Sequence, residues 1–232
     1  MKWIHDFQLF LFDFDGLLVN TERLHYQAYV NVLAMRGMDL SWNFNRFCEL
    51  AHLNSTALKE AMCAEVPALA ADWPQLYAEK KKAYFELISA GKIEMMPGAA
   101  ELLAALQKAN ICRCVVTHSL REQIEVVRRH LKPLQTIPHW ITREEYEKPK
   151  PDPECYLRAI QLHGKAGDRI IGFEDSIRGL RALRQTPALP ILVCPSHHPL
   201  FEMASEGVVH FESLADVSAD KLSDKRNGYA NS

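Results

Sequence analysis

The sequence predicts an α/β fold, with a parallel β-sheet covered by helices on both faces and an all-helical segment inserted into it. Three observations predict this architecture. A short apolar run, Gln8 to Phe14, precedes a long segment without strand-like runs, from about Thr21 to Ala90. After Pro97-Gly98, short apolar runs alternate with helical stretches. Such alternation is typical of parallel strands that are buried on both faces.

The first apolar run is read as a buried strand because it is short and ends in an acidic turn at Asp13. The segment that follows is read as helical because apolar residues recur at helical spacing, from Leu24 to Met35, until Gly37 ends the first helix. We therefore expect two domains, residues 1–18 with 95–232 and residues 19–94. Further helices are expected at Ser41 to Leu50, Ser55 to Glu65 and Asp72 to Ile88.

The second part of the chain supplies the remaining strands and helices. Its apolar runs predict strands at Ile111 to Thr117, Ile137 to Thr142, Arg169 to Phe173, Ile191 to Cys194 and Val208 to Phe211. Helices are expected at Leu120 to Leu131, Pro153 to His163 and Ser176 to Arg184, and disorder in the polar tail from Ser218.

Composition argues against several classes of function. The chain has 232 residues and a net charge of −2, so no overall basic field favours nucleic-acid binding. The apolar run Leu9 to Phe12 is too short for a signal peptide, and no stretch is long enough to span a membrane. We expect a cytoplasmic protein with a small-molecule substrate and no membrane partner; the oligomeric state is open, and a monomer is consistent with the sequence.

Acidic residues stand at the ends of two predicted strands. Asp13 and Asp15 follow the first strand, and Glu174 and Asp175 follow the strand that begins at Arg169. Residues two apart in an extended chain point to the same side, so paired carboxylates call for a cation, and oxygen ligands suit Mg²⁺. The alternative is that Asp15 starts a turn and Asp175 caps a helix.

Two further residues complete a candidate site for a phosphoryl group. Thr117 offers a hydroxyl at a strand end, where the amides of the next helix favour an anion. Lys148, in the segment Glu147 to Asp152, offers a positive charge. A hydroxyl, helix-start amides, a lysine and a bound cation together form an electrostatic clamp for phosphate.

Four segments resemble the motifs of the haloacid dehalogenase superfamily: DFDGLLVNTE, VVTHS, EKPKPD and GFEDS, in this order. The resemblance extends to about Phe211 and implies a Rossmann-like core with an inserted helical cap. It implies that Asp13 is the nucleophile, Asp15 the general acid–base and Thr117 the phosphoryl-binding hydroxyl. It assigns the catalytic lysine to Lys148 in preference to Lys150. The implied Mg²⁺ ligands are Asp13, Asp15 through its carbonyl, Asp175, and Glu174 directly or through water.

Within this family the motifs favour a phosphatase of small phosphorylated metabolites, of the sugar phosphate or phosphoglycolate type. Dehalogenases lack the second aspartate, so Asp15 indicates phosphoryl transfer. A phosphomutase resembling β-phosphoglucomutase is the alternative, although Ala51 to Asn54 lacks the Gly and Arg of the mutase cap loop. A phosphonatase would need a cap lysine that forms a Schiff base. A phosphate-binding module without activity is the remaining hypothesis, against which the intact motifs argue.

Substrate contacts are expected from the insertion and from the second motif. Thr21 and His25 match hinge-side positions of the family, and Glu22 completes an N-T-E sequence close to a common D-T-E. Lys80 aligns with a cap lysine that reaches the substrate in some relatives, although it also begins a charge run typical of a solvated helix face. The other two candidates are Asn54 and His118.

Overall fold

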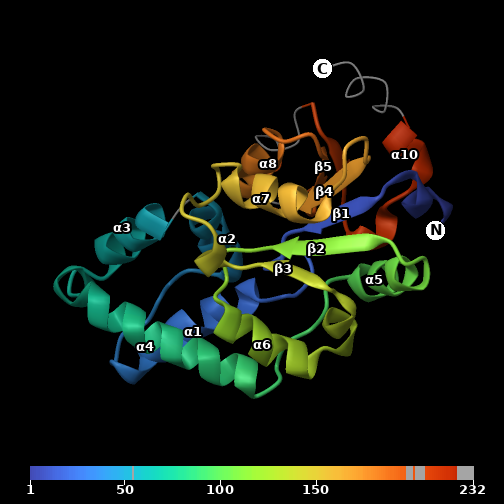
Figure 1. Cartoon of the computed structure of the whole chain (residues 1–232). Coiled ribbons are helices and arrows are strands. Elements are labelled where there is room, and N and C mark those ends of the chain that lie inside the picture. Colours follow the sequence, from blue (N-terminus) through green and yellow to red (C-terminus); the bar gives the residue numbers. More distant parts are fainter. Residues whose placement is uncertain (54, 197–200, 202–206, 224–232) are drawn as a thin grey trace. The chain divides into compact units, whose positions relative to one another are not determined.

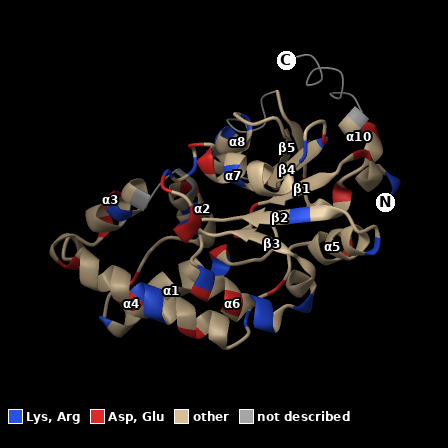
Figure 2. Ribbon diagram, viewed as in Figure 1, with Lys and Arg blue, Asp and Glu red and all other residues tan. Residues whose placement is uncertain are grey.

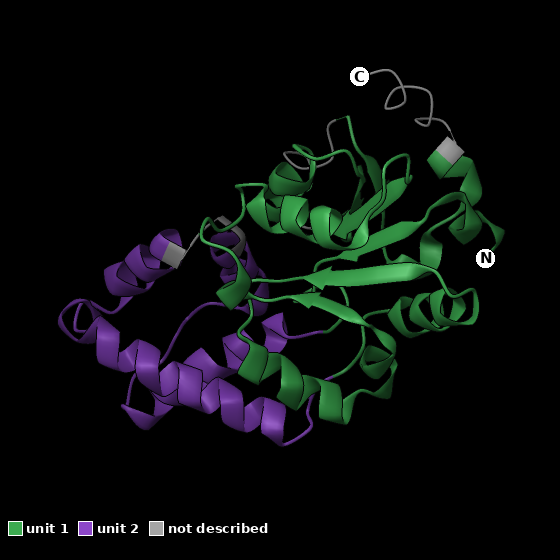
Figure 3. Ribbon diagram, viewed as in Figure 1, with its two compact units in different colours: residues 1–19, 94–232 green, residues 20–93 purple. Residues whose placement is uncertain are grey.

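The computed structural model describes residues 1–53, 55–196, 201 and 207–223. The chain divides into two compact units (Figure 3), one formed by residues 1–19 with 94–232 and the other by residues 20–93. We call them the core unit and the helical unit, and each is described by itself. In the described part of the chain, no helix combines the length and the apolar character needed to cross a membrane.

The core unit contains a parallel sheet, as predicted (Figure 1). Among the described residues it has six strands in the order β3-β2-β1-β4-β5-β6. Every neighbouring pair is parallel. The strands are β1 (Leu9–Phe12), β2 (Cys112–Val116), β3 (His139–Ile141), β4 (Ile170–Glu174), β5 (Leu189–Val193) and β6 (Val209–Phe211).

Strand β1 lies between β2 and β4, and its register decides which residues meet at the end of the sheet. Leu11 is opposite Cys114 of β2 and Gly172 of β4. The chain therefore leaves the three central strands at the same edge, close to Asp13, Thr117 and Asp175. The carboxyl ends of parallel strands are where ligands bind in open α/β sheets.

Helices cover both faces of this sheet (Figure 1). Helices α7 (Glu154–His163) and α8 (Ile177–Leu183) lie on one face, and α5 (Ala99–Lys108) and α6 (Arg121–His130) on the other. Helix α5 was not among the predicted helices. Disorder was predicted from Ser218, but residues Ala219–Ser223 form helix α10, so the prediction is wrong for these residues. Residues 224–232 lie outside the described part. Short 3-10 helices are η1 (Lys2–Asp6), η2 (Lys132–Thr136), η3 (Arg143–Glu145) and η4 (Leu214–Asp216).

The alternation of side chains in β1 builds a hydrophobic core on each face of the sheet. Leu9 and Leu11 join the cluster that includes residues of α7. Phe10 and Phe12 point the other way, and each stacks on Phe173, with ring centroids 6.3 and 5.3 Å away. Successive side chains of a strand face opposite sides of a sheet, so a wholly apolar strand must be buried on both faces.

The helical unit consists of α1 (Glu22–Met35), α2 (Phe44–Leu53), α3 (Ser55–Glu65) and α4 (Leu69–Ser89). These helices enclose their own hydrophobic cluster, which includes Tyr29, Leu33 and Leu76. Arg36, at the end of α1, lies 2.7 Å from a carboxylate oxygen of Asp72 and 2.8 Å from one of Glu79. These ion pairs join the end of α1 to α4.

Candidate active site

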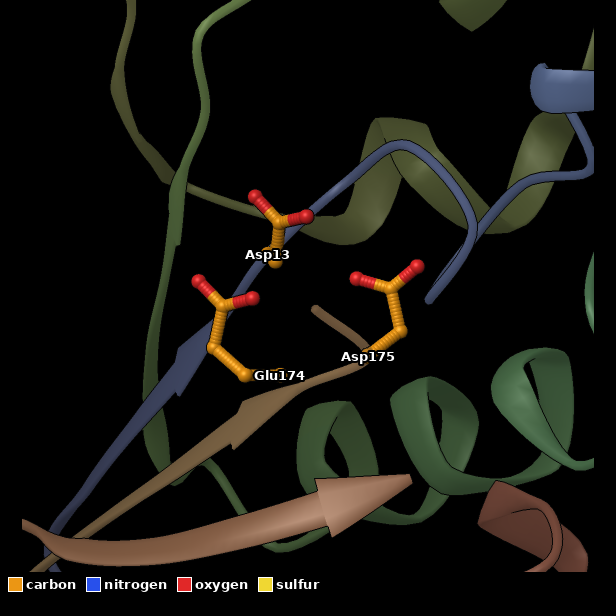
Figure 4. Close-up of side chains that lie close together, drawn as sticks. All are labelled: Asp13, Glu174 and Asp175. Carbon is orange, nitrogen blue, oxygen red and sulfur yellow. The ribbon is translucent and has the colours of Figure 1, made fainter. Parts of the chain in front are cut away.

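Three carboxylates converge at the edge of the sheet where β1 and β4 end (Figure 4). One carboxylate oxygen from each of Asp13, Glu174 and Asp175 lies within 4.8 Å of the other two. Glu174 is fully buried and Asp175 is also buried. The backbone holds Asp13 in place, because its N–H donates to the carbonyl oxygen of Phe173 at 3.0 Å. Clustered carboxylate oxygens of this kind are the donor set that Mg²⁺ prefers.

A buried lysine, Lys150, joins two of these carboxylates. Its Nζ donates to Asp13 Oδ1 and to Glu174 Oε1, both at 2.7 Å, and to the carbonyl oxygen of Val116 at 2.9 Å. Burial lowers the pKa of Lys150, but the carboxylates of Asp13 and Glu174 outweigh burial and raise it above the usual value. Lys150 is therefore a cation at neutral pH. One ammonium group does not balance three carboxylates, so the cluster can accept a further cation.

The second aspartate, Asp15, is held by the loop after β2. Ser119 Oγ donates to Asp15 Oδ2 at 2.6 Å, and Thr117 Oγ1 donates to the same oxygen at 3.4 Å. The backbone N–H of Ser119 donates to Thr117 Oγ1 at 2.9 Å, which fixes the hydroxyl of this buried threonine. Gly16, with φ of +82°, allows the chain to turn immediately after Asp15.

Tyr156 on α7 completes the buried network, and the sequence alone gave it no role. Its hydroxyl donates to Glu174 Oε1 and accepts a hydrogen bond from Lys150 Nζ at 3.1 Å. The side chain is fully buried. Burial and the nearby Glu174 raise the pKa of Tyr156 well above its usual value, so its hydroxyl stays protonated as a donor. The tyrosine thus fixes Glu174 and Lys150 relative to each other.

Residues 10–188 match the model of a known protein family, described as haloacid dehalogenase-like hydrolase. The chain belongs to this family. It is 30% identical over 196 residues to Protein CbbY of Rhodobacter capsulatus, an alignment that covers 81% of this chain and 85% of that one. It is 26% identical over 211 residues to validoxylamine A 7'-phosphate phosphatase of Streptomyces hygroscopicus subsp. limoneus, covering 91% and 96%.

The fold agrees with that of a solved protein structure. The crystal structure of CbbY from Rhodobacter sphaeroides in complex with phosphate superposes with a TM-score of 0.73 at 24% identity. The superposition covers 94% of this chain and 99% of the CbbY chain. The family that the four motifs predicted, and the α/β fold, are therefore confirmed, and the chain is a hydrolase of this family.

The prediction of which lysine lies at the carboxylates of this haloacid dehalogenase-like site needs a correction. Lys148, which the sequence favoured, is exposed, and its backbone N–H donates to Glu154 Oε2 at 2.8 Å. The expectation that its side chain lies at the carboxylates is wrong, because Lys150 takes that place. The pattern K-P-x-P begins twice, at Lys148 and again at Lys150. Only the second of these starting points directly precedes α7, the helix that carries Tyr156.

His118 contacts the loop that carries Lys150 in this haloacid dehalogenase-like site. Its Nε2 accepts the backbone N–H of Lys150 at 2.9 Å, so the imidazole positions the loop. Burial, followed by the positive charges of Lys150, Arg178 and Arg143, lowers the pKa of His118 from 6.5 to about 3. The neutral ring is thus the form that accepts this hydrogen bond at neutral pH.

This shifted pKa makes stability depend on pH in a predictable direction. The unfolded chain binds a proton at residue 118 below pH 6.5, whereas the folded chain does so only near pH 3. His118 therefore contributes stability above pH 6.5 that is lost as the pH falls. The variant His118→Gln keeps a hydrogen-bond acceptor and does not titrate. Below pH 6.5, the free energy of unfolding of the unmodified chain should fall by up to about 1.4 kcal/mol more per pH unit than that of this variant.

Denaturant unfolding of both proteins near pH 7 and near pH 5 measures this difference. Parallel losses of stability in the two proteins would show that the pKa of His118 is close to its ordinary value.

The helical unit contains the other candidate residues of this haloacid dehalogenase-like chain. Lys80 is buried rather than solvated, and its Nζ lies 2.6 Å from Nδ1 of His25. The ring of His25 stacks on Tyr84 at 3.9 Å between centroids. Burial first, and then the charge of Lys80, keeps the pKa of His25 well below its usual range. Thr21 is also buried.

Two further residues, Glu22 and Asn54, were predicted from the sequence to contact the substrate. Glu22 is the first residue of α1 and is half-buried. Asn54 lies outside the described residues. Their proposed contacts with substrate, and those of Thr21, His25 and Lys80, stay predictions.

Proposed function

We propose that this protein is a magnesium-dependent phosphatase of small phosphorylated metabolites, of the sugar phosphate or phosphoglycolate type, and that it works through an aspartyl-phosphate on Asp13. The observation that carries the proposal is the meeting of three carboxylates and one buried ammonium group at the ends of β1 and β4. The family membership of the chain and the phosphatase among its relatives support the same reading.

Each residue of the site has a distinct task in the proposed reaction. Lys150 engages Asp13 Oδ1, which leaves the other carboxylate oxygen to attack phosphorus. As the new oxygen–phosphorus bond forms, the ester bond breaks and Asp15 gives its proton to the leaving oxygen. Water then attacks the phosphoryl group and gives a proton to Asp15, which releases inorganic phosphate and restores Asp13.

The surroundings of Asp15 and Asp13 suit these tasks. Ser119 and Thr117 hold the carboxylate of Asp15 beside the nucleophile's strand, where it can exchange protons with the leaving oxygen and the water. Asp13, Glu174 and Asp175 would hold Mg²⁺, together with the carbonyl of Asp15. The bound ion would supply charge neutralisation for the phosphoryl oxygens.

The helical unit is proposed to act as the cap that selects the substrate. Its buried Lys80–His25 pair provides a cationic group held by Tyr29 and Tyr84, whose rings lie 5.1 and 5.3 Å from Lys80 Nζ. A buried positive charge in the helical unit suits an anionic substrate.

A screen of phosphate release over a panel of metabolite phosphates, with and without Mg²⁺, tests the proposed function. We expect release from a subset of sugar or glycolate phosphates, and its loss when the metal is chelated. Isomerised product without release of inorganic phosphate would contradict the phosphatase and favour the phosphomutase. No turnover across the panel would favour a binding module.

The variant Asp13→Asn provides the mechanistic control for this screen. It removes the nucleophile but keeps the size of the side chain, so turnover should fall by at least about 10³-fold while metal-dependent binding of the substrate is retained. Binding by calorimetry and turnover by phosphate release separate the two effects. Turnover close to that of the unmodified chain would eliminate Asp13 as nucleophile.

A further inference from the structure

A basic groove lies on the outside of the core unit, next to the loop that carries Lys150. Its volume is about 740 Å³, within the range of small-molecule sites. Two elements form it: the loop between β3 and α7, and the end of α8, whose basic residues are blue in Figure 2. We define the basic groove by its lining residues, which are Lys148, Pro149, Pro151, Asp152, Arg181, Arg184 and Gln185.

The three cations of the basic groove form no ion pairs within the described part of the chain. Lys148, Arg181 and Arg184 are exposed, and no ion pair to any of them is found in the described part of the chain. The arginines that do form ion pairs are Arg36, Arg46, Arg121 and Arg128. The basic groove is thus a local positive region in a chain with a net charge of −2.

The carboxylates near the basic groove accept hydrogen bonds from backbone N–H groups. Asp152 Oδ1 accepts the N–H of Glu154 at 3.0 Å. The two carboxylate oxygens of Glu154, in an adjoining hollow, accept the N–H groups of Glu147 at 2.9 Å and Lys148 at 2.8 Å. These hydrogen bonds hold the loop and the start of α7. The N–H groups of Glu147 and Lys148, and then the charge of Lys148, lower the pKa of Glu154, so this carboxylate stays charged. The three cations nevertheless outnumber the two carboxylates, and positive charge is in excess around the basic groove.

A simpler explanation accounts for only part of the basic groove. Arg181 in the last turn of α8, and Arg184 at its C-cap, would interact favourably with the helix dipole. That effect does not account for Lys148, which comes from a different element and faces the same hollow. Cations from two elements that surround one concave surface indicate an anionic ligand.

We propose that the basic groove binds a small molecule that carries two or more linked phosphoryl groups, at a place separate from the carboxylates of Asp13 and Glu174. The guanidinium groups of Arg181 and Arg184, three residues apart on one helix face, match the geometry of phosphoryl oxygens. Lys148 adds a third charge from the other element that lines the groove. Cations on two elements can engage separate phosphoryl groups, so linked groups fit the basic groove.

Such a ligand would contact the loop that presents Lys150. Pro149 and Pro151 flank Lys150 and line the basic groove. Gln185 Nε2 joins the two walls by donating to the carbonyl oxygen of Pro151 at 3.0 Å. One short loop therefore carries both Lys150, which contacts the carboxylate cluster, and residues that line the basic groove.

Calorimetric titration with sodium tripolyphosphate, in the presence of a chelator that removes divalent metal, tests this proposal independently of catalysis. The unmodified chain should bind it saturably, and the double variant Arg181→Gln with Arg184→Gln should bind about tenfold more weakly or worse. The matched control is Arg129→Gln with Lys132→Gln, which removes two exposed cations outside the basic groove. It should bind like the unmodified chain.

Several outcomes would overturn the proposal. These are absence of saturable binding by the unmodified chain at millimolar concentrations, equal affinity of the two double variants, and orthophosphate binding as tightly as tripolyphosphate. Tighter binding of an oligoglutamate peptide would overturn it in favour of an acidic protein partner. Thermal unfolding of each variant confirms that lost binding does not come from lost folding. The proposed phosphatase activity can fail without affecting any of these measurements.

Discussion

Replacing Lys150 by alanine should lower kcat/KM by about 10²- to 10³-fold, whereas Lys148→Ala should leave it within about twofold. Lys150 Nζ lies 2.7 Å from both Asp13 Oδ1 and Glu174 Oε1 inside the protein. Its loss removes the cation that holds the nucleophile and that would face a transferring phosphoryl group. Lys148 is exposed, and the ion pairs found for Asp13 and Glu174 in the described part of the chain are with Lys150.

Steady-state phosphate release with the best substrate of the metabolite screen measures both variants. The matched pair removes the same side chain from the same loop, so general effects of charge or loop stability appear in both. A large loss in Lys148→Ala with little change in Lys150→Ala would reverse the assignment of the catalytic lysine. A thermal unfolding curve for each variant separates loss of catalysis from loss of folding.

Replacing Gly179 by alanine should disable the site and destabilise the core unit, although the change adds a single methyl group. A Cβ at this position would lie 2.0 Å from the carboxylate of Glu174, which is fully buried. The carboxylate would have to move away from Lys150 and Tyr156. Disrupting a buried ion pair in this way costs about 3–5 kcal/mol, and the acidic cluster would lose its geometry.

Denaturant unfolding and phosphate release measure the two effects of Gly179→Ala. The control is the same substitution in a Glu174→Ala background, where the carboxylate that collides is absent. There the added methyl group should cost less than about 1 kcal/mol, because the two substitutions share one contact. An equal loss of stability in both backgrounds would show that the collision with Glu174 is not the cause.

The positions of the strands were predictable because they depend on local patterns. The strands are short and largely apolar, and in the central strand β1 every residue is buried. Helix α5 was missed because the elements expected after Pro97-Gly98 began only at Ile111, although Asn110, with φ of +52°, separates the helix from β2. Its left-handed start at Gly98, with φ of +81°, becomes evident only in the structure.

The position of the lysine was not predictable because two lysines alternate with prolines in one loop. Which of them faces inward depends on how the loop is anchored. The backbone N–H of Lys148 is bound by Glu154 on α7, and that of Lys150 by His118 from the loop after β2. The first contact is local, but the second joins residues that are 32 positions apart in the chain. This long-range contact holds Lys150 where its side chain reaches Asp13.

Tyr156 and Gly179 belong to the site for reasons that only packing reveals. Each lies on a helix that the sequence predicted. Tyr156 is an ordinary residue for a helix, whereas a glycine inside α8 is a local signal of close packing, although the sequence does not show with what. Their common partner, Glu174, ends β4. Lys80 is similar: it begins a charge run, Lys80 to Lys82, but packs between Tyr29 and Tyr84 inside the helical unit.

The sequence by itself determined the family, the parallel sheet and the acids at the strand ends, because strand periodicity and chain order place Asp13, Glu174 and Asp175 at one edge. Only the tertiary structure decided which lysine meets them, which tyrosine and glycine position Glu174, and where exposed cations gather in the basic groove. Those choices depend on side-chain direction and on contacts between distant elements, and the local sequence pattern specifies neither.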